Sequence, residues 1–430
     1  MKCGALLLLS LALVILPACA RERIDTSDVG RLIRALSADS MEGRASLAPG
    51  SERAMRFIEN EFSAIGLEPL PGSVGFRQEF PVIVVTPVSC EATLNGAAIP
   101  ADRLFALSSQ ESLRSDQSGG FAVAFIGKEA NVRRKLSEIR SRGENTLVII
   151  APEHKQSFDR YRSFTSDRSI RSEPDEGPSV VAVLADSVPV GSFSLLIRNS
   201  VEVKPIANIA GMIRGNRSNE IVLFSAHYDH LGIVSPVEGD SIANGADDDA
   251  SGTAAVVALA RYFAGKEKPE RTIFFVAFAA EEIGGFGSRY FSKQLTPESI
   301  VAMCNIEMIG MRSKFGPKSA WITGFDRSSF GPIMAEGAAD SGFAFHPDPY
   351  GEQNLFYRSD NATLARLGVP AHSISSSQID QDPYYHTVND EVETLDVPHM
   401  SSVIRGIAKG MEAIISGAKT PTRIERTPER

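Results

Sequence analysis

The residues best suited to chemistry in this 430-residue chain are acidic and histidine side chains that follow strand-like apolar runs. Carboxylate oxygens and histidine nitrogens are ligands that zinc takes in proteins. Three such runs, near residues 221–224, 273–280 and 301–306, end in one or more of them. In chain order the candidates are His227, Asp229, Asp247–Asp249, Glu281, Glu282 and Glu307. Because α/β sheets bind ligands outside the carboxyl ends of their strands, the pattern predicts a metal site in one crevice there.

Each of these features has a simpler explanation when it is taken alone. Aspartates before the helix-like segment 250–264 can cap it and favour its dipole, an effect worth roughly 0.3–1 kcal/mol. An isolated Glu281–Glu282 pair is by default an exposed strand end. Three adjacent aspartates, however, repel one another unless a counter-ion lies nearby. Their recurrence with histidine and glutamate at successive strand ends favours metal, and two metals roughly 3.5–4 Å apart need a bridging carboxylate.

The elements that must position these side chains alternate regularly after Ala207. The pattern predicts strands at 220–226, 272–280, 300–306, 320–323 and 369–373, and helices at 250–264, 287–294, 329–341, 359–367 and 398–416. Such alternation indicates an α/β three-layer sandwich, in which helices cover both faces of a largely parallel mixed sheet. Upstream, apolar residues recur at helical spacing over Ser51–Ile65 and predict an amphipathic helix that packs on the core.

A middle segment differs in character and predicts a small inserted β-rich domain. Strand-like runs at 121–126, 146–150 and 180–184 surround one helical stretch, Val132–Arg142, as in a βαβ unit. Acidic residues are interleaved in the basic segment Arg160–Arg171, so we expect a solvated loop there. The predicted division is 19–85 and 204–417 for the catalytic domain, 86–203 for the insert and 418–430 for a disordered tail.

The first residues predict export. Lys2 precedes the apolar run Ala5–Ile15, which is too short to span a membrane and is typical of a signal peptide, here residues 1–18. Leu16–Cys19 resembles the lipobox of bacterial lipoproteins, which implies a lipid anchor on Cys19 and a location in the bacterial cell envelope, on the periplasmic or outer-membrane side. Ala18-Cys19-Ala20 also fits a small-x-small cleavage site, so a soluble secreted form stays open.

The overall composition argues against a nucleic-acid partner. A hydrophobic share of 43% is ordinary for a globular protein, and a formal net charge of −9 does not suit phosphate binding. Apart from Cys19, the mature chain contains Cys90 and Cys304. Export would permit a disulfide between them, but Cys304 lies in a strand-like run, which favours free thiols.

Together, seven motifs resemble the co-catalytic di-zinc aminopeptidases, exopeptidases with an α/β sandwich that are often secreted and often carry a protease-associated domain. The motifs are LSADSMEGR (36–44), FIENEFSAIGLEP (57–69), 207–232 with its SAHYDHLG, GADDDASG (245–252), AAEEIGGFGS (279–288), NIEMIG (305–310) and YYHTVNDEVETLD (384–396). The resemblance covers most of the mature chain. It implies two Zn²⁺ per chain, peptide substrates and release of N-terminal residues.

The resemblance also implies a role for individual residues. The implied zinc ligands are His227 and Glu307 for one ion, Glu282 and His386 for the other, and Asp248 as the bridge. Glu281 would act as the general base, and Asp229 would be the carboxylate that orients His227. Tyr385 would hydrogen-bond the tetrahedral intermediate.

Two positions depart from the family pattern. Glu307 stands where aspartate is commoner, so its longer arm must shift the backbone or the metal by about one methylene. Asn361 stands where many relatives have histidine, and we expect altered substrate contacts there and no loss of zinc. The other histidines, His230 beside the site and also His154, His346, His372 and His399, are not expected to bind metal.

Three other functions remain open from the sequence. A single-zinc glutaminyl cyclase would share the fold, although the bridging and second-metal residues are retained here. A carboxypeptidase acting on acidic C-termini would need a basic pocket, in which the sequence cannot place Arg312, Arg327 or Arg358. A non-catalytic binding protein is a third alternative, and the complete ligand set with Glu281 argues against it.

Overall fold

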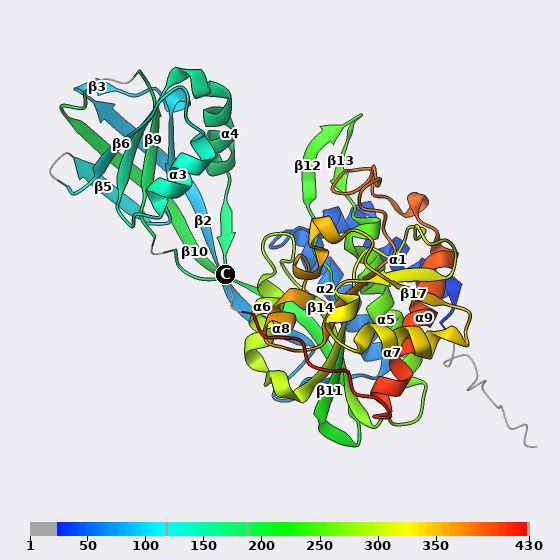
Figure 1. The fold of residues 1–430 in the computed structure, drawn as a ribbon. Helices are drawn as coiled ribbons and strands as arrows, with labels where there is room; N and C mark the ends of the chain where they lie inside the picture. The colour runs from blue at the N-terminus through cyan, green and yellow to red at the C-terminus, as the bar shows by residue number, and fades with distance from the viewer. Residues whose placement is uncertain (1–23, 117–118, 176, 187–188, 428–430) are drawn as a thin grey trace, which may run out of the picture. The chain divides into compact units, whose positions relative to one another are not determined.

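A computed structural model describes residues 24–427 apart from 117–118, 176 and 187–188. The chain forms two compact units, Met1–Gln78 with Ala207–Arg430, here called the larger unit, and Glu79–Ile206, the inserted unit. Strands β2 (Arg77–Leu94) and β10 (Phe193–Ile213) each run from one unit into the other (Figure 1). The division therefore lies within these two strands. The predicted signal peptide and Cys19 lie outside the described residues.

The larger unit is built on a mixed sheet with a parallel centre. Its strand order is β17-β16-β18-β15-β11-β14-β10, and β11 pairs in parallel with both β14 and β15. β10 is antiparallel to β14, and β16 is antiparallel to β18. The strands are β11 (Arg217–His227), β14 (Arg271–Phe278), β15 (Ile300–Ile306), β16 (Ser319–Ile322), β17 (Ala344–Pro347) and β18 (Ala371–Ser375), and β1 (Glu68–Pro69) pairs with β10. The predicted fold class is confirmed.

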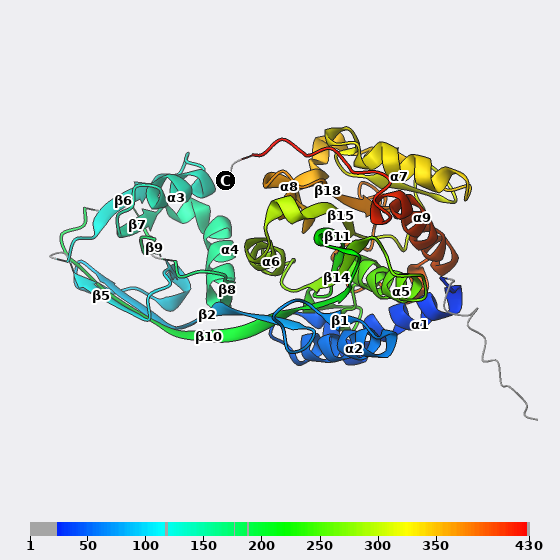
Figure 2. The same cartoon turned by 90° about the horizontal axis from the view of Figure 1, so that it is seen from below.

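Helices cover both faces of this sheet, as Figure 2 shows. On one face, Phe224 stacks on Phe263 of α5 at a ring-centroid distance of 5.6 Å. On the other, Phe278 contacts Phe291 of α6 at 5.4 Å, beside Leu364 of α8. The helices are α1 (Thr26–Leu36), α2 (Pro49–Ile65), α5 (Gly252–Ala264), α6 (Phe286–Gln294), α7 (Phe330–Ala339), α8 (Asn361–Arg366) and α9 (Val397–Ile415). Because both faces are covered, every residue of β14 is buried, as its continuous apolar sequence requires.

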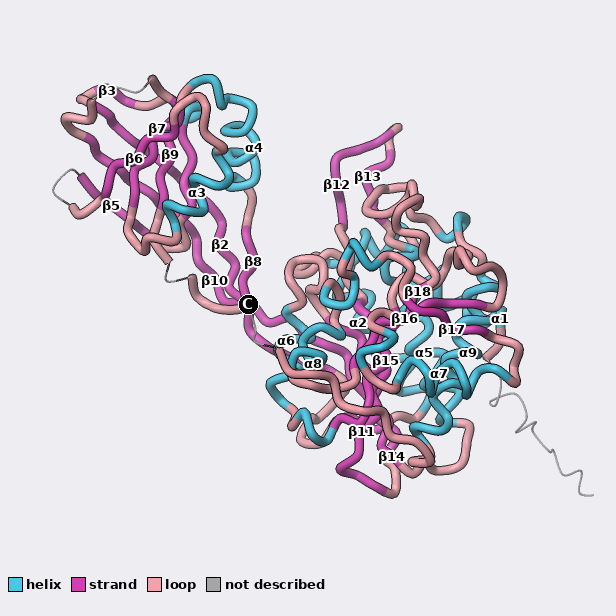
Figure 3. The backbone as a smooth tube through the Cα atoms, viewed as in Figure 1, coloured by secondary structure: helices cyan, strands magenta, loops and turns pink. Residues whose placement is uncertain are grey.

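The inserted unit has its own sheet, in the order β4-β9-β7-β6 (Figure 3). Two apolar clusters include residues of β7 and β9, so these strands contribute to both cores of the unit. Its elements are β3 (Ala97–Ala98), β4 (Leu104–Leu107), β5 (Ser112–Asp116), β6 (Ala122–Ile126), α3 (Val132–Arg140), β7 (Thr146–Ile150), α4 (Lys155–Ser166), β8 (Ser169–Arg171) and β9 (Val180–Leu184). β6 and β9 both pair in parallel with β7.

The prediction of a solvated loop over Arg160–Arg171 is wrong for its first half, because α4 continues to Ser166. Phe158 is fully buried in this helix, and its ring lies 4.8 Å from that of Phe105. Tyr161 stacks on the same ring at 5.8 Å. A narrow aromatic stripe thus anchors a helix whose many charged residues conceal it in the sequence.

The prediction of a disordered tail is also wrong for residues 418–427. Ile424 is buried in the cluster that contains Val369, and its amide donates to the carbonyl oxygen of Gly368 at 3.1 Å. Arg271 donates to the carbonyl oxygen of Lys419 at 2.8 Å. One buried isoleucine and these bonds order a segment whose composition is otherwise typical of disorder.

Two findings bear on the expectations about cysteine and membrane. Cys90 and Cys304 are free thiols, Cys304 being buried, as the strand-like run around it predicts. Within the described part of the chain, no helix combines the length and the apolar character that a membrane crossing requires.

Candidate metal centre

The sheet brings the predicted ligands to one edge. His227 is the last residue of β11, Glu281 and Glu282 follow the end of β14 by three and four residues, and Glu307 directly follows β15. Asp248 comes from the short helical turn η5 (Ala246–Ser251), which leads into α5. Parallel strands end on the same side of a sheet, which is why residues so far apart in the chain meet here.

One group of donor atoms forms around His227. Its Nε2 lies 3.3 Å from Asp248 Oδ1 and 3.3 Å from Glu307 Oε1. Its Nδ1 lies 3.0 Å from the carbonyl oxygen of Asp229, to which it donates. With the proton on Nδ1, the lone pair of Nε2 faces the two carboxylates, as a metal ligand requires.

A second group forms around His386. Its Nε2 lies 3.1 Å from Asp248 Oδ2 and 3.3 Å from Glu282 Oε2. Asp248 therefore presents one carboxylate oxygen to each group. This is the arrangement that a bridging carboxylate needs.

The donor set fits zinc. A tetrahedral zinc with bonds of about 2.0–2.1 Å to nitrogen and oxygen places its ligand atoms roughly 3.3 Å apart, close to the separations in both groups. The side chains of Asp248 and Glu282 are only 4% and 8% exposed. Carboxylates that share a buried space are costly unless cations accompany them. Both the distances and the charge thus suit bound metal.

Glu281 is placed differently from the ligands. Its backbone amide donates to Asp229 Oδ1 at 3.0 Å, and its side chain lines the same pocket as Asp248 and Glu307. Burial raises the pKa of Glu281 well above its usual range, and the nearby carboxylate of Asp360 adds to the effect. A carboxyl group that lies beside the two donor groups and belongs to neither is placed to transfer a proton.

Asp229 contacts His227 in a way the sequence did not predict. Its carboxylate was expected to orient the imidazole, but Oδ1 lies 3.9 Å from Nδ1 of His227. The carbonyl oxygen makes that contact, and the carboxylate instead accepts hydrogen bonds from the Glu281 amide and from Ser46 at 3.3 Å. Asp229 thus makes hydrogen bonds both to the predicted ligand His227 and to the backbone of the predicted base Glu281.

Glu307 and Asn361, the two positions that depart from the family pattern, each make specific hydrogen bonds. Oε2 of Glu307 accepts a hydrogen bond from Ser359 at 2.6 Å, which holds the longer arm while Oε1 faces His227. Asn361 is fully buried, and its amide donates to two backbone carbonyl groups. Its oxygen accepts from Ser373 at 2.9 Å. Asn361 therefore supports Ser373, which lines the pocket, and is not itself among the lining residues.

His230 belongs to the site, although the sequence predicts no metal-binding role for it. Its Nδ1 lies 2.8 Å from Glu282 Oε1 and 3.9 Å from Asp248 Oδ2. The ring packs against Gly245, whose φ is +55° and where a Cβ atom would lie 2.4 Å from the imidazole. The sequence feature that could have indicated this role is the second histidine of His-Tyr-Asp-His, which follows the same strand end as His227.

Arg44, from the LSADSMEGR motif, braces the loops that carry these residues. Its guanidinium is fully buried and donates to the carbonyl oxygens of Leu36, Tyr228, Asn244 and Gly245 at 2.6–2.8 Å. These bonds join the chain that follows β11 to the turn that precedes Asp248. The motif therefore has a structural role that its sequence did not disclose.

A pocket of about 100 Å³ opens beside the metal-binding residues. Besides ligands and Glu281, its lining residues are Met308, Trp321, Thr323, Leu355, Arg358, Ser359, Ser373, Ser375, Ser377, Ile379 and Tyr385. Burial raises the pKa of Tyr385, whose ring stacks on His386 at 3.9 Å. The phenol is therefore protonated at neutral pH and can donate a hydrogen bond.

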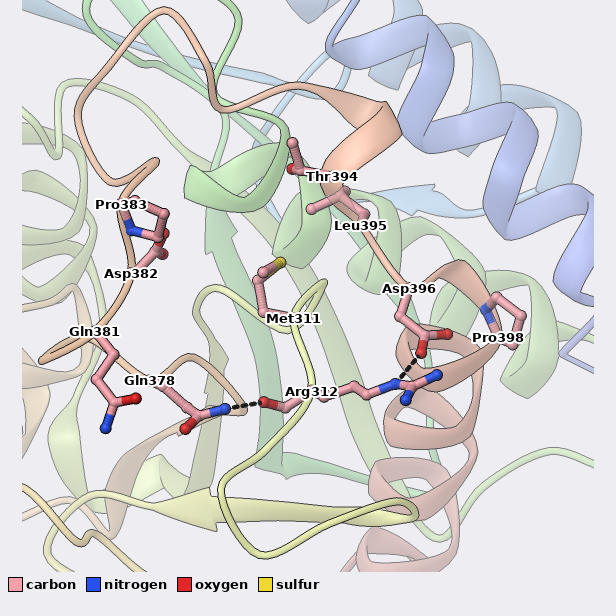
Figure 4. A pocket seen from close by; sticks show the side chains of 10 residues that line it. All are labelled: Met311, Arg312, Gln378, Gln381, Asp382, Pro383, Thr394, Leu395, Asp396 and Pro398. Atoms are coloured by element: carbon pink, nitrogen blue, oxygen red, sulfur yellow. Dashed lines mark hydrogen bonds and ion pairs between the residues drawn. The ribbon is translucent and has the colours of Figure 1, made fainter.

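A larger hollow of about 620 Å³ lies elsewhere on this unit, and Figure 4 shows its lining. It contains Gln378, Asp382 and the ion pair of Arg312 with Asp396. None of the predicted ligands lines it. Size alone would favour this hollow, but the chemistry of the side chains favours the smaller pocket.

Comparison with known proteins agrees with this arrangement. Residues 208–411 match peptidase family M28. A probable zinc metalloprotease of Pyrenophora teres f. teres is 33% identical over 138 residues, which cover 31% of this chain and 28% of that protein. A probable leucine aminopeptidase 1 of Trichophyton verrucosum is 30% identical over 207 residues, 43% of this chain and 52% of that protein. The chain thus spans about half or less of these curated relatives.

The fold also recurs in a solved structure. An aminopeptidase from Aneurinibacillus sp. strain AM-1 has a TM-score of 0.57 and 16% identity over 95% of this chain and 98% of that chain. The matched family segment contains both donor groups and Glu281. Residues 208–411, somewhat less than half of the chain, are thus similar to peptidase family M28.

Proposed function

We propose that the protein is a two-zinc aminopeptidase that releases N-terminal residues from peptides. The observation that carries the proposal is the position of Asp248, which presents Oδ1 to His227 at 3.3 Å and Oδ2 to His386 at 3.1 Å. Glu307 would complete the first zinc site and Glu282 the second. The names of the relatives, zinc metalloprotease and leucine aminopeptidase, support this class of reaction.

The residues of the chain would share the reaction as follows. Zinc ions, when bound, would polarise the scissile carbonyl and lower the pKa of a bound water from about 15.7 toward 7. Glu281 would accept the proton of the attacking water and deliver it to the leaving amine. Tyr385, protonated because burial raises its pKa, would donate a hydrogen bond to the developing oxyanion.

Metal content and turnover, measured together, test the proposal. We expect about two zinc ions per chain by elemental analysis and chelator-sensitive release of p-nitroaniline from aminoacyl-p-nitroanilides. Glu281→Gln should retain zinc and lose about 10²- to 10⁴-fold in kcat, because it removes the general base. Bound zinc without release would redirect the search to carboxypeptidase and glutaminyl cyclase substrates. A protein that binds no metal would contradict the proposal.

We further propose export and attachment to the bacterial envelope through lipid on Cys19, supported by the Leu16–Cys19 sequence. We also propose that the inserted unit is a protease-associated-like domain, which rests on its position between two parts of the larger unit, directly before the segment that matches peptidase family M28. Labelling with a radioactive fatty acid tests the anchor. Cys19→Ser should abolish the label if the anchor exists.

A further inference from the structure

One cation lines the pocket beside the proposed metal centre. Arg358 follows the short turn η9 (Leu355–Tyr357) and directly precedes Ser359, which holds Glu307. No other lysine or arginine is among the described residues that line this pocket. Arg358 is also close enough to Tyr385 to lower its pKa against the effect of burial. The backbone of Arg358 is therefore held beside the site by Ser359, which donates to Glu307.

The other two arginines considered from the sequence, Arg312 and Arg327, each have an interaction partner, whereas Arg358 has none among the described residues. Arg312 pairs with Asp396, outside the pocket. Arg327 lies over the ring of Phe356, 4.7 Å from its centroid. Arg358 is exposed, and in the part of the chain that the structure describes its guanidinium has no carboxylate or hydrogen-bond acceptor. A guanidinium that lines a pocket without a partner is suited to bind a carboxylate in a bidentate manner.

The charge of the pocket with zinc bound also favours a carboxylate ligand. Its anionic lining residues are the carboxylates of Asp248, Glu281, Glu282 and Glu307. If two divalent zinc ions are bound, as the proposed function requires, their charge equals that of these four lining carboxylates when all are ionised, and Arg358 adds one positive charge to the lining. An anionic group of the substrate would restore neutrality.

A second polar group faces the pocket without a partner. The hydroxyl of Ser377 is buried and makes no hydrogen bond to described residues, and Ser377 lines the pocket. A buried hydroxyl without a partner is costly, so a ligand that accepts its proton would be favoured. Trp321, whose indole nitrogen donates to the carbonyl oxygen of Ser377 at 3.1 Å, and Leu355 supply apolar surface for an aliphatic chain.

We infer that Arg358 is a specificity-determining residue that binds a substrate carboxylate within one residue of the scissile bond. This inference rests on the proposed function. Two sources supply the same chemistry. One is the side chain of an N-terminal glutamate or aspartate, and the other is the terminal carboxylate of a dipeptide. The enzyme therefore favours acidic N-terminal residues or dipeptides over neutral, longer peptides.

Four peptides distinguish the two sources. Glu-Ala-amide against Gln-Ala-amide tests the side-chain carboxylate, and Ala-Ala against Ala-Ala-amide tests the terminal one. In one of the two pairs, kcat/KM of the zinc-loaded protein should be about 10- to 100-fold higher for the anionic member, the range expected for a hydrogen bond to a charged group. Arg358→Gln should reduce that ratio to about one. Arg327→Gln, which removes a nearby charge outside the pocket, should preserve it.

Binding without turnover separates this inference from the proposed function. Titration calorimetry of the same peptides into the zinc-loaded Glu281→Gln protein should show the same 10- to 100-fold preference, and Arg358→Gln in that background should abolish it. Preference in binding without any turnover would support Arg358 as the carboxylate receptor while contradicting the aminopeptidase. Turnover with equal kcat/KM and equal affinity in both pairs would overturn the inference and leave the aminopeptidase standing.

Discussion

The two oxygens of Glu282 face different partners, and the difference defines the role of His230. Oε2 lies 3.3 Å from His386, a separation typical of two ligands on one zinc. Oε1 lies 2.8 Å from Nδ1 of His230, which is a hydrogen-bond distance. His230, Asp248 and Glu282 also lie close enough together to hold a metal ion. Because the 2.8 Å contact is a hydrogen-bond distance, we infer that His230 orients Glu282, as partners of metal ligands commonly do.

Replacing His230 should weaken zinc binding more than it weakens the fold. We expect His230→Asn to lower zinc affinity about 10- to 100-fold, the usual cost of losing such a partner. Competition with a coloured chelator measures the affinity, and thermal unfolding of the metal-free protein measures the fold. His346→Asn is a suitable control, because His346 stacks on Phe315 and lies outside the ligand groups. Unchanged zinc affinity in His230→Asn would contradict this role.

The metal-free site should show its own pH dependence through His386. Hydrogen bonds from its imidazole to Asp248 and Glu282 raise the pKa of His386 to about 10, against about 6.5 in an unfolded chain. The stability that protonated His386 contributes is therefore complete below pH of about 6.5 and is lost as pH rises through about 10.

Urea unfolding of chelator-treated protein at pH 6, 8 and 10 measures this effect. We expect the free energy of unfolding to fall across this series and to fall less in His386→Gln. Zinc ligands must be unprotonated, so zinc binding at pH 8 should also release a proton, detectable by calorimetry in buffers of different ionisation enthalpy. Equal pH dependence in both proteins would show that other groups dominate.

At the scale of elements, the site depends on how two loops are held together. Gly245 has a positive φ, and a Cβ atom there would lie 2.3 Å from the carbonyl oxygen of Asp248. No other side chain can replace Arg44 easily, because its one planar guanidinium donates hydrogen bonds to four carbonyl oxygens. These contacts set the distance between the strand end of His227 and the turn of Asp248.

Arg44→Lys should therefore destabilise the larger unit. An ammonium group keeps the charge but cannot reach all four carbonyl oxygens, and each buried group left without a partner costs about 1–3 kcal/mol. We expect the free energy of unfolding in urea to fall by at least that amount. Arg56→Lys, at a side chain that is 71% exposed, should change it by less than about 0.5 kcal/mol. Equal stability of both variants would contradict a bracing role.

At the scale of the whole molecule, metal should stabilise one unit only. The donor groups around His227 and His386 both lie in the larger unit, whereas the inserted unit has two apolar clusters of its own. A ligand that binds only the folded state at 100 times its dissociation constant adds about 2.7 kcal/mol. Removal of zinc should lower the unfolding temperature of the larger unit and leave that of the inserted unit unchanged.

Differential scanning calorimetry with and without chelator checks this expectation, and excess zinc should reverse the shift. Separately expressed Glu79–Ile206 supplies the reference transition if it folds alone. A chelator shift of equal size in every transition would show that the units unfold as one.

The local elements and most of the candidate site residues could be predicted from the sequence. Strands such as β14 were predictable because an unbroken apolar run of this length, ending in polar residues, suits a strand buried on both faces. Glu281 and Glu307 were identifiable because they follow such runs. Where local composition misled, in α4 and in the segment around Ile424, a few buried residues outweighed many polar ones.

Which atoms of the site come into contact depends on how distant elements of the chain pack together. His227 and Glu307 are 80 residues apart, and their 3.3 Å contact results from the parallel pairing of β11 with β15. The sequence could not reveal that the carbonyl oxygen of Asp229 accepts a hydrogen bond from His227. Nor could it reveal that Arg358 lines the pocket. Hydrophobic periodicity is local and fixes elements, whereas side-chain contacts depend on the packing of distant elements, which no local pattern records.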